Sequence, residues 1–242
     1  MKCNNFYYVS IDIQKSEVFS CGGKFSEFIN FISIKPENIL LMKGNFYEGH
    51  WNNKIGLDYA DKNNINDLIS DDVYNYGDFV WVDYEDKDAI DNILPIELAE
   101  LLYISHMKMP LNTPFFKTLN NNYIYLAHDD NYWTKIYMKN IYDYKKVIEG
   151  KILKELKGRK REVLPIPEHI INLIFDGACE GILIDFESTY YISGSTGVNI
   201  YKMGKYRDYD QIHDVFERKK DCRNLITLEY RNKKWKIYDQ WK

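Results

Sequence analysis

The sequence predicts an α+β fold in which mostly antiparallel hairpins pack against three or four main helices. Two observations predict it. Segments rich in β-branched and aromatic residues occur in pairs joined by short turns. Segments with apolar residues at helical spacing lie between those pairs. With 242 residues, of which 45% are hydrophobic, the chain is long enough to bury a core as one large domain or as two small ones.

The first third of the chain contains five segments with the composition of regular structure. They are, in order, a strand over 6–13, a helix over 24–33, a strand over 39–42, a surface helix over 61–72 and a strand over 78–84. The helix over 24–33 is predicted because Phe25, Phe28, Ile29 and Ile32 recur at three- and four-residue spacing. Residues 44–53 are predicted to be irregular.

The stretch from Leu94 to Tyr144 combines the best helix with the best hairpin. Pro95 suits the first turn of a helix, which should run to about Lys108. The apolar face of this helix is predicted to consist of Leu98, Leu101, Leu102, Ser105 and Met109. Strands over 123–128 and 133–138 follow, joined by turn-forming residues.

A second unit echoes this order. A helix over 142–156 is followed by a basic linker over 157–161, which divides the chain into α+β lobes over 1–156 and 162–242 unless the two pack as one domain. The second lobe has six predicted elements. They are a helix over 167–175, a strand over 181–186, strands over 190–193 and 198–203, a helix over 208–218 and a hairpin over 225–238. The units over 94–144 and 164–209 are either a duplication or a recurring order without common descent.

Charge and composition discount several function classes. The chain has 32 basic and 36 acidic side chains, a net charge of -4, and therefore no general attraction for phosphate backbones. Its longest apolar runs are far shorter than a membrane helix, and no signal peptide is evident. Four scattered cysteines suggest reduced thiols. We therefore expect a soluble, cytoplasmic protein with no membrane or nucleic-acid partner, and leave a small-molecule ligand open.

The most suggestive polar triplet is His128-Asp129-Asp130, at the end of a predicted strand. These residue types could bind a divalent metal, or His128 and Asp129 could act in general acid–base catalysis. The alternative, which the sequence favours, is a hairpin turn, because aspartate and asparagine suit tight turns for backbone reasons.

A second acidic group follows the strongest strand. It comprises Asp83, Glu85, Asp86 and Asp88. Carboxylates at a strand end are where hydrolases place metal ligands, so Asp83 and Glu85 join His128 and Asp129 as candidate catalytic residues. The alternative is a solvated first turn of a helix, where acidic side chains are favoured. The sequence favours that alternative.

Three further motifs have simpler explanations. The loop Gly194–Gly197 could cradle a phosphate, but it leads into a strand and suits a hairpin turn. Cys179, with His169 ten residues before it, could be a nucleophile, but it also fits a tight bend between glycines. The run Lys157–Arg161 is flanked by acids and suits a solvated linker. No cofactor is predicted.

Four segments in the middle of the chain carry a resemblance to a known family. They are Phe79–Asp86, Glu97–Tyr103, His106–Leu111 and Tyr125–Asp130. In these segments the chain resembles a family of uncharacterised cytosolic proteins from low-GC Gram-positive bacteria, some of which carry an oxalate/formate transporter label. That label does not fit a chain without a span-length apolar run. The resemblance implies no established activity, and no catalytic residue is carried over.

Two functional hypotheses follow. The first is a non-enzymatic protein-interaction protein that neutralises or senses a partner; it predicts an exposed aromatic or methionine patch and no deep polar pocket. The alternative is a small metal-assisted hydrolase or transferase that uses His128, Asp129 and Asp83. It predicts that these groups converge in one cleft with perturbed pKa values.

Overall fold

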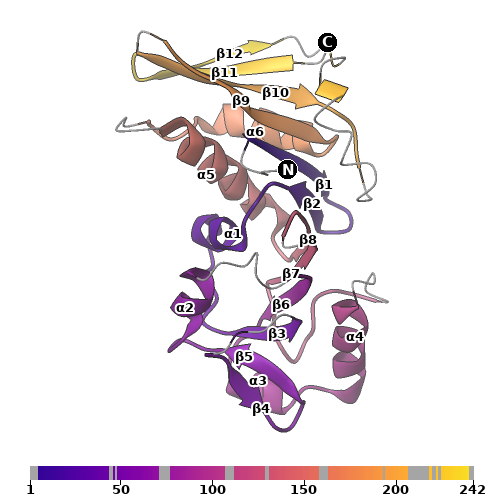
Figure 1. Cartoon of the computed structure of the whole chain (residues 1–242). Coiled ribbons are helices and arrows are strands. Elements are labelled where there is room, and N and C mark those ends of the chain that lie inside the picture. Colours follow the sequence, from indigo (N-terminus) through magenta and orange to yellow (C-terminus); the bar gives the residue numbers. More distant parts are fainter. Residues whose placement is uncertain are drawn as a thin grey trace.

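One antiparallel sheet organises the protein (Figure 1). The structure is a computed structural model that describes residues 5–43, 46, 48–70, 77–106, 112–128, 131–157, 163–192, 194–206, 218–219, 222 and 225–239. Within these residues the sheet has twelve strands in the order β12-β11-β10-β9-β1-β2-β8-β7-β6-β3-β5-β4. The α+β fold class with antiparallel hairpins is thereby confirmed.

The strands are mostly short, and consecutive strands usually pair as hairpins. Their bounds are β1 Phe6–Asp12, β2 Glu17–Cys21, β3 Ile39–Lys43, β4 His50–Asn52, β5 Leu57–Ala60, β6 Phe79–Asp83, β7 Tyr123–His128, β8 Trp133–Met138, β9 Ile182–Ile192, β10 Ser195–Lys202, β11 Leu225–Arg231 and β12 Lys234–Asp239. The helices within the described residues are α1 Phe25–Phe31, α2 Ile65–Ser70, α3 Lys87–Asp91, α4 Pro95–Ser105, α5 Tyr144–Lys157 and α6 Glu168–Ala178. A 3₁₀ turn over Ile141–Asp143 leads into α5.

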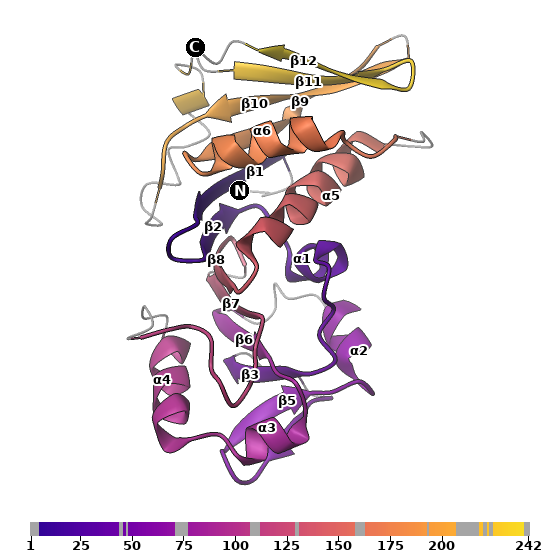
Figure 2. The same ribbon diagram turned by 180° about the vertical axis from the view of Figure 1, so that it is seen from behind.

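Helices α1, α2, α5 and α6 lie along one face of the sheet, and α3 and α4 cover part of the other face (Figures 1 and 2). In β6, Phe79 and Trp81 point into a core shared with α1, α2, α5 and α6, whereas Val80 and Val82 point into a core shared with α3 and α4. Successive side chains of a strand face opposite sides, so a strand buried on both faces must be apolar throughout. This explains why β6 reads as the strongest strand in the sequence. Among the described helices, none is both long and apolar enough to cross a bilayer.

The sheet and its core continue across the predicted lobe boundary. Strand β1 pairs with β2 on one side and with β9 on the other, with Phe6 opposite Asp185 and Val9 opposite Ile182. Residues from both predicted lobes also share the core beneath α5 and α6. The division into lobes and the internal duplication both stay predictions. The linker ends at residues outside the described range, but its first residue, Lys157, is the last residue of α5.

Four strands of the structure differ from the prediction. Strands β2 and β5 were not predicted, and β4 lies in the stretch expected to be irregular. The two strands predicted over 181–186 and 190–193 are one strand, β9, whose pairing with β10 shifts register between Gly197 and Asn199. The predicted helix over 208–218 lies almost entirely outside the described residues.

The predicted buried face of α4 was partly wrong. Leu101 and Ser105 are buried as expected, but Leu102 is 44% exposed and Ile104 is buried instead. The buried Glu100 accepts hydrogen bonds from Asn112 N at 2.9 Å and Asn112 Nδ2 at 3.1 Å, which ties that side of α4 to the following loop. Met109 lies outside the described residues.

Candidate functional site

Asp83, a predicted catalytic residue, joins two strands. Its buried carboxylate accepts hydrogen bonds from Asn122 N at 2.9 and 3.0 Å, from Asn122 Nδ2 at 2.9 Å and from Tyr123 N at 2.7 Å. Burial raises the pKa of Asp83 to about 6, although these hydrogen bonds favour the charged form. The carboxylate thus fixes the end of β6 to the start of β7.

The acids that follow Asp83 begin α3. Asp86 is the N-cap residue of this helix, and its carboxylate accepts a hydrogen bond from Ala89 N at 3.0 Å. Glu85 is exposed and accepts a hydrogen bond from Asn120 Nδ2 at 3.2 Å. The acids after Asp83 therefore lie at the start of a helix, as expected if they form its solvated first turn and not a metal site.

His128 lies at the C-terminal end of β7, in contact with a different acid. Its Nδ1 is 3.0 Å from Asp78 Oδ1, and its ring stacks on Trp133 with 4.1 Å between ring centroids. Burial lowers the pKa of His128, and Asp78 offsets only part of that effect. Its predicted companions, Asp129 and Asp130, lie outside the described residues.

The described candidates do not converge. Strands β6 and β7 are antiparallel, with Phe79 opposite Ala127 and Val82 opposite Ile124. His128 therefore lies near the start of β6, and Asp83 at its end. Four to five residues of strand separate these positions, which corresponds to about 15 Å. Across the described residues, no three His, Cys, Asp or Glu side chains are grouped to hold a metal ion.

Two further motifs occupy structural positions. Ser195–Gly197 lies in β10, where Ser195 pairs with Ile192, so the glycine-containing segment is part of a hairpin. Cys179 caps the C-terminal end of α6, whereas His169 is near its start. Burial raises the pKa of the Cys179 thiol, with a further contribution from Asp176, so the protonated form is favoured.

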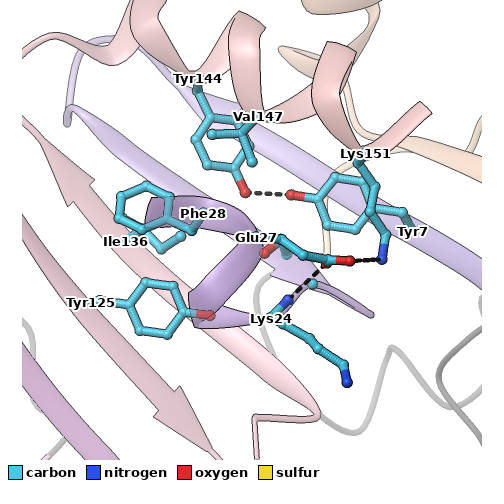
Figure 3. A pocket seen from close by; sticks show the side chains of 11 residues that line it. Tyr7, Lys24, Glu27, Phe28, Tyr125, Ile136, Tyr144, Val147 and Lys151 are labelled. Atoms are coloured by element: carbon cyan, nitrogen blue, oxygen red, sulfur yellow. Dashed lines mark hydrogen bonds and ion pairs between the residues drawn. The ribbon is translucent and has the colours of Figure 1, made fainter. Parts of the chain in front are cut away.

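A buried polar cluster that was not predicted lies between the sheet, α1 and α5 (Figure 3). Tyr7 on β1, Glu27 on α1, and Tyr144 and Lys151 on α5 line a cavity of about 10 Å³. A cavity of that size admits about one water molecule. The sequence signal for this cluster was a charged residue inside each apolar helical stripe: Glu27 beside Phe28, and Lys151 beside Ile152.

Glu27 and Lys151 form the ion pair of this cluster. The Lys151 ammonium is 2.9 and 3.1 Å from the two carboxylate oxygens, with both side chains below 10% exposure, and Lys154 adds a contact of 2.7 Å from the rim. Burial acts to raise the pKa of Glu27, but the two ammonium groups together hold it below its ordinary value. The pair links α1 to α5.

The two tyrosines of the cluster take part in it through their hydroxyl groups. The hydroxyls of Tyr7 and Tyr144 are hydrogen-bonded to each other, and the Ser20 hydroxyl is 2.6 Å from that of Thr134. Burial raises the pKa of Tyr144 to about 12 and that of Tyr7 well above its ordinary value. Both phenols stay protonated at neutral pH. Their arrangement can orient one water and fix α5 on the sheet.

The other unusual feature is the outer surface of α4, on the opposite face of the sheet. Ile96 is 68% exposed, Leu94 52%, Leu102 44% and Tyr103 40%. Ile96, Ala99 and Tyr103 follow one another at three- and four-residue spacing, so they share one helix face, with Leu102 beside it. The helix is thus apolar on the side that packs on the sheet and also on the side that faces solvent.

Acidic side chains lie at the start of the short helix that precedes α4 in the chain. Glu85, Asp86 and Asp88 are exposed at the start of α3, where Lys87 is the nearest cation in sequence. Only three residues separate α3 from α4. We call this combination of α3 acids with the exposed apolar residues of Leu94–Tyr103 the α3–α4 surface.

The predicted aromatic or methionine patch is only partly represented there. Tyr103 is aromatic, but the remainder is aliphatic, and Met107 and Met109 lie outside the described residues. No protein-family model, curated protein or solved structure matches this chain.

Proposed function

We propose that this protein binds a partner protein through the α3–α4 surface, and that the partner presents basic side chains around an apolar groove or helix face. The observation that carries the proposal is α4, which is apolar on two sides but buries only one. A helix that is apolar all round is normally enclosed by protein. Ile96, Leu102 and Tyr103 are the part of α4 that a partner would enclose.

The surface is held rigidly enough to dock without much reorganisation. On its inner side, Leu101 and Ile104 are fully buried in the core beneath α4. At its N-terminal end, Glu97 accepts a hydrogen bond from Lys117 N at 2.9 Å. A preorganised helix loses little conformational entropy on binding. Full burial of an aliphatic or aromatic side chain contributes about 1.5–3 kcal/mol, so three such groups could anchor a specific complex.

The acids of α3 define the charge of the partner. Glu85, Asp86 and Asp88 are exposed at the start of α3, the helix that precedes α4, and would attract a cationic rim. Such steering mainly raises the association rate, and it weakens as salt is added. A basic, apolar protein segment is therefore the occupant that this surface favours.

We further propose that the protein works in the cytoplasm. The four cysteines are scattered along the chain without a C-x-x-C pair, which suits reduced thiols in a reducing compartment. The family resemblance noted above agrees with this location.

The proposal is tested with a model ligand of the expected chemistry. A fluorescent helical peptide of about 18 residues, with leucines along one face and lysines elsewhere, serves as the probe. Fluorescence anisotropy should report saturable binding, and the variant Ile96→Gln/Tyr103→Gln should weaken it about tenfold because the apolar contact is lost. The matched control Ile34→Gln/Tyr238→Gln alters two comparably exposed apolar residues outside α3 and α4 and should bind like the wild type.

The charge contribution is tested separately. Asp86→Asn/Asp88→Asn keeps the capping acceptor at the start of α3 but removes two charges, so it should weaken binding and flatten its salt dependence. Binding at this surface is contradicted if the variant Ile96→Gln/Tyr103→Gln and its matched control bind the peptide equally well.

A scrambled peptide without an apolar face should bind more weakly than the helical one.

A further inference from the structure

A groove on the other face of the sheet lies between the end of α1 and the outer side of α5. Its volume is about 660 Å³, and Phe31, Gly150, Leu153 and Pro165 are its apolar lining residues. Phe31 and Leu153 are half-buried against the core, whereas Pro165 is exposed, so the groove opens to solvent. Its lining shares no residue with that of the small polar cavity or with the α3–α4 surface.

The rim of this groove is positively charged. Lys146, Lys154 and Lys157 line it together with a single acid, Glu149. That acid is already engaged, because its carboxylate accepts a hydrogen bond from Ile166 N at 2.9 Å. The lining residues therefore carry three ammonium groups against one carboxylate, so the rim has an excess of positive charge.

The three lysines differ in how far they are already paired. Lys154 contacts Glu27 at 2.7 Å, and Lys146 lies 3.6 Å from Asp143. Glu27 also pairs with Lys151, so its single charge is shared between two lysines. Lys157 forms no ion pair with a described residue. An anion in the groove would meet ammonium groups whose charge is only partly compensated.

The groove owes its depth to one glycine. A Cβ at Gly150 would lie 2.4 Å from the Phe31 ring, so only glycine lets that ring pack against α5. The ring and Leu153 then form a floor that a single apolar side chain could cover. The site thus combines an apolar floor with a cationic rim.

We infer that this groove binds an acidic peptide segment of a partner protein, with one apolar side chain on the floor and carboxylates beside the lysines. Lys146 and Lys157 are eleven residues apart on α5, which corresponds to about 16 Å along the helix axis. An extended peptide of about five residues covers that length. A small ligand usually has most of its surface enclosed, whereas this groove is open and suits a chain that passes through it.

The experiment uses the full-length protein and a labelled seven-residue peptide with a central phenylalanine flanked by two aspartates on each side. Fluorescence anisotropy should report saturable binding, and Lys146→Glu/Lys157→Glu should weaken it about tenfold. The charge-matched control is Lys139→Glu/Lys145→Glu. Lys145 lies over the rings of Tyr142 and Phe175, at 5.4 and 5.1 Å, outside the lining of the groove. This control should leave the affinity nearly unchanged.

Several results would overturn the inference. One is that the wild type does not bind the peptide. Another is that the groove variant and its control lose affinity equally, because the peptide would then respond only to the net charge of the protein. A peptide with asparagine in place of every aspartate should bind far more weakly. Equal binding of the two peptides would mean that the lysines do not recognise carboxylates. Self-association of the protein that displaces the peptide would assign the groove to a second copy of this chain. None of these results depends on α3 or α4.

Discussion

At the scale of single residues, the buried Glu27–Lys151 pair is the clearest determinant of stability. The variant Glu27→Gln removes the carboxylate that pairs with the buried Lys151 ammonium. The carboxylate of Glu155, at 3.7 Å, is then the one that stays within ion-pair distance. We expect the free energy of unfolding in urea to fall by about 3 kcal/mol, because an uncompensated buried charge is costly. Lys154→Ala removes only the exposed partner and should cost at most about 1 kcal/mol. Equal effects of the two substitutions would contradict a role for burial.

Asp83 should give the protein an unusual pH dependence. Because burial raises its pKa to about 6 in the folded state, the folded protein binds more protons than the unfolded chain between about pH 4 and pH 6. The contribution of Asp83 to stability therefore falls as pH rises through that window. Urea unfolding of wild type and Asp83→Asn isolates this effect, since other groups titrate alike in both proteins.

The expected result concerns the difference between the two unfolding free energies. The advantage of wild type over Asp83→Asn should shrink by roughly 2 kcal/mol between pH 4 and pH 7. An advantage that grows with pH would mean that the four hydrogen bonds to the carboxylate outweigh its burial.

Most contacts of individual side chains could not be predicted from the sequence. Asp86 could be predicted to start a helix, because capping is local. The partners of Asp83 lie about forty positions away, and those of Glu27 more than a hundred. The buried pair of Glu27 and Lys151 was not predicted; its only sign in the sequence is a charged residue within each apolar helical segment.

At the scale of elements, the contact of α1 with α5 depends on Gly150. Gly150→Ala gains about 1 kcal/mol of helix propensity, but its Cβ collides with the Phe31 ring, and overpacking costs about 1–3 kcal/mol. We expect net destabilisation in a wild-type background. In a Phe31→Ala background, where the collision is absent, the same substitution should be stabilising. A double-mutant cycle by urea unfolding measures this change of sign.

Periodicity predicted most elements but not all their boundaries. It found α1, α5 and α6 from their helical spacing, and β6 stood out as a run of four large apolar residues. It missed β2 and β5, in which polar or charged residues interrupt the apolar ones. It misplaced Leu102 because α4 is apolar on both sides, so a pattern alone could not distinguish the packed side from the exposed one.

At the scale of the whole molecule, the continuous sheet should make the protein unfold as one unit. Substitution of Ile184 by Ala in β9 and of Val82 by Ala in β6 removes buried side chains from opposite sides of the predicted lobe boundary. Each should shift a single unfolding transition, with circular dichroism and tryptophan fluorescence coinciding. Two separate transitions, each sensitive to only one substitution, would instead support independent lobes.

The sheet also separates the two proposed surfaces. The acidic, apolar α3–α4 surface lies on one face and the basic α1–α5 groove on the other (Figure 2). Their opposite charges would let one protein contact two partners of different chemistry. Composition could not reveal this, because 32 basic and 36 acidic side chains nearly cancel over the whole chain.

The most direct test of the central claim is an NMR titration of isotope-labelled protein with the leucine–lysine peptide. Binding at the α3–α4 surface predicts that the amide shifts change most for Ile96, Ala99, Leu102 and Tyr103 and for the start of α3, with little change along α5 or at β12. Changes centred on any other element, or spread evenly over the exposed acids, would contradict the assignment of partner binding to α4.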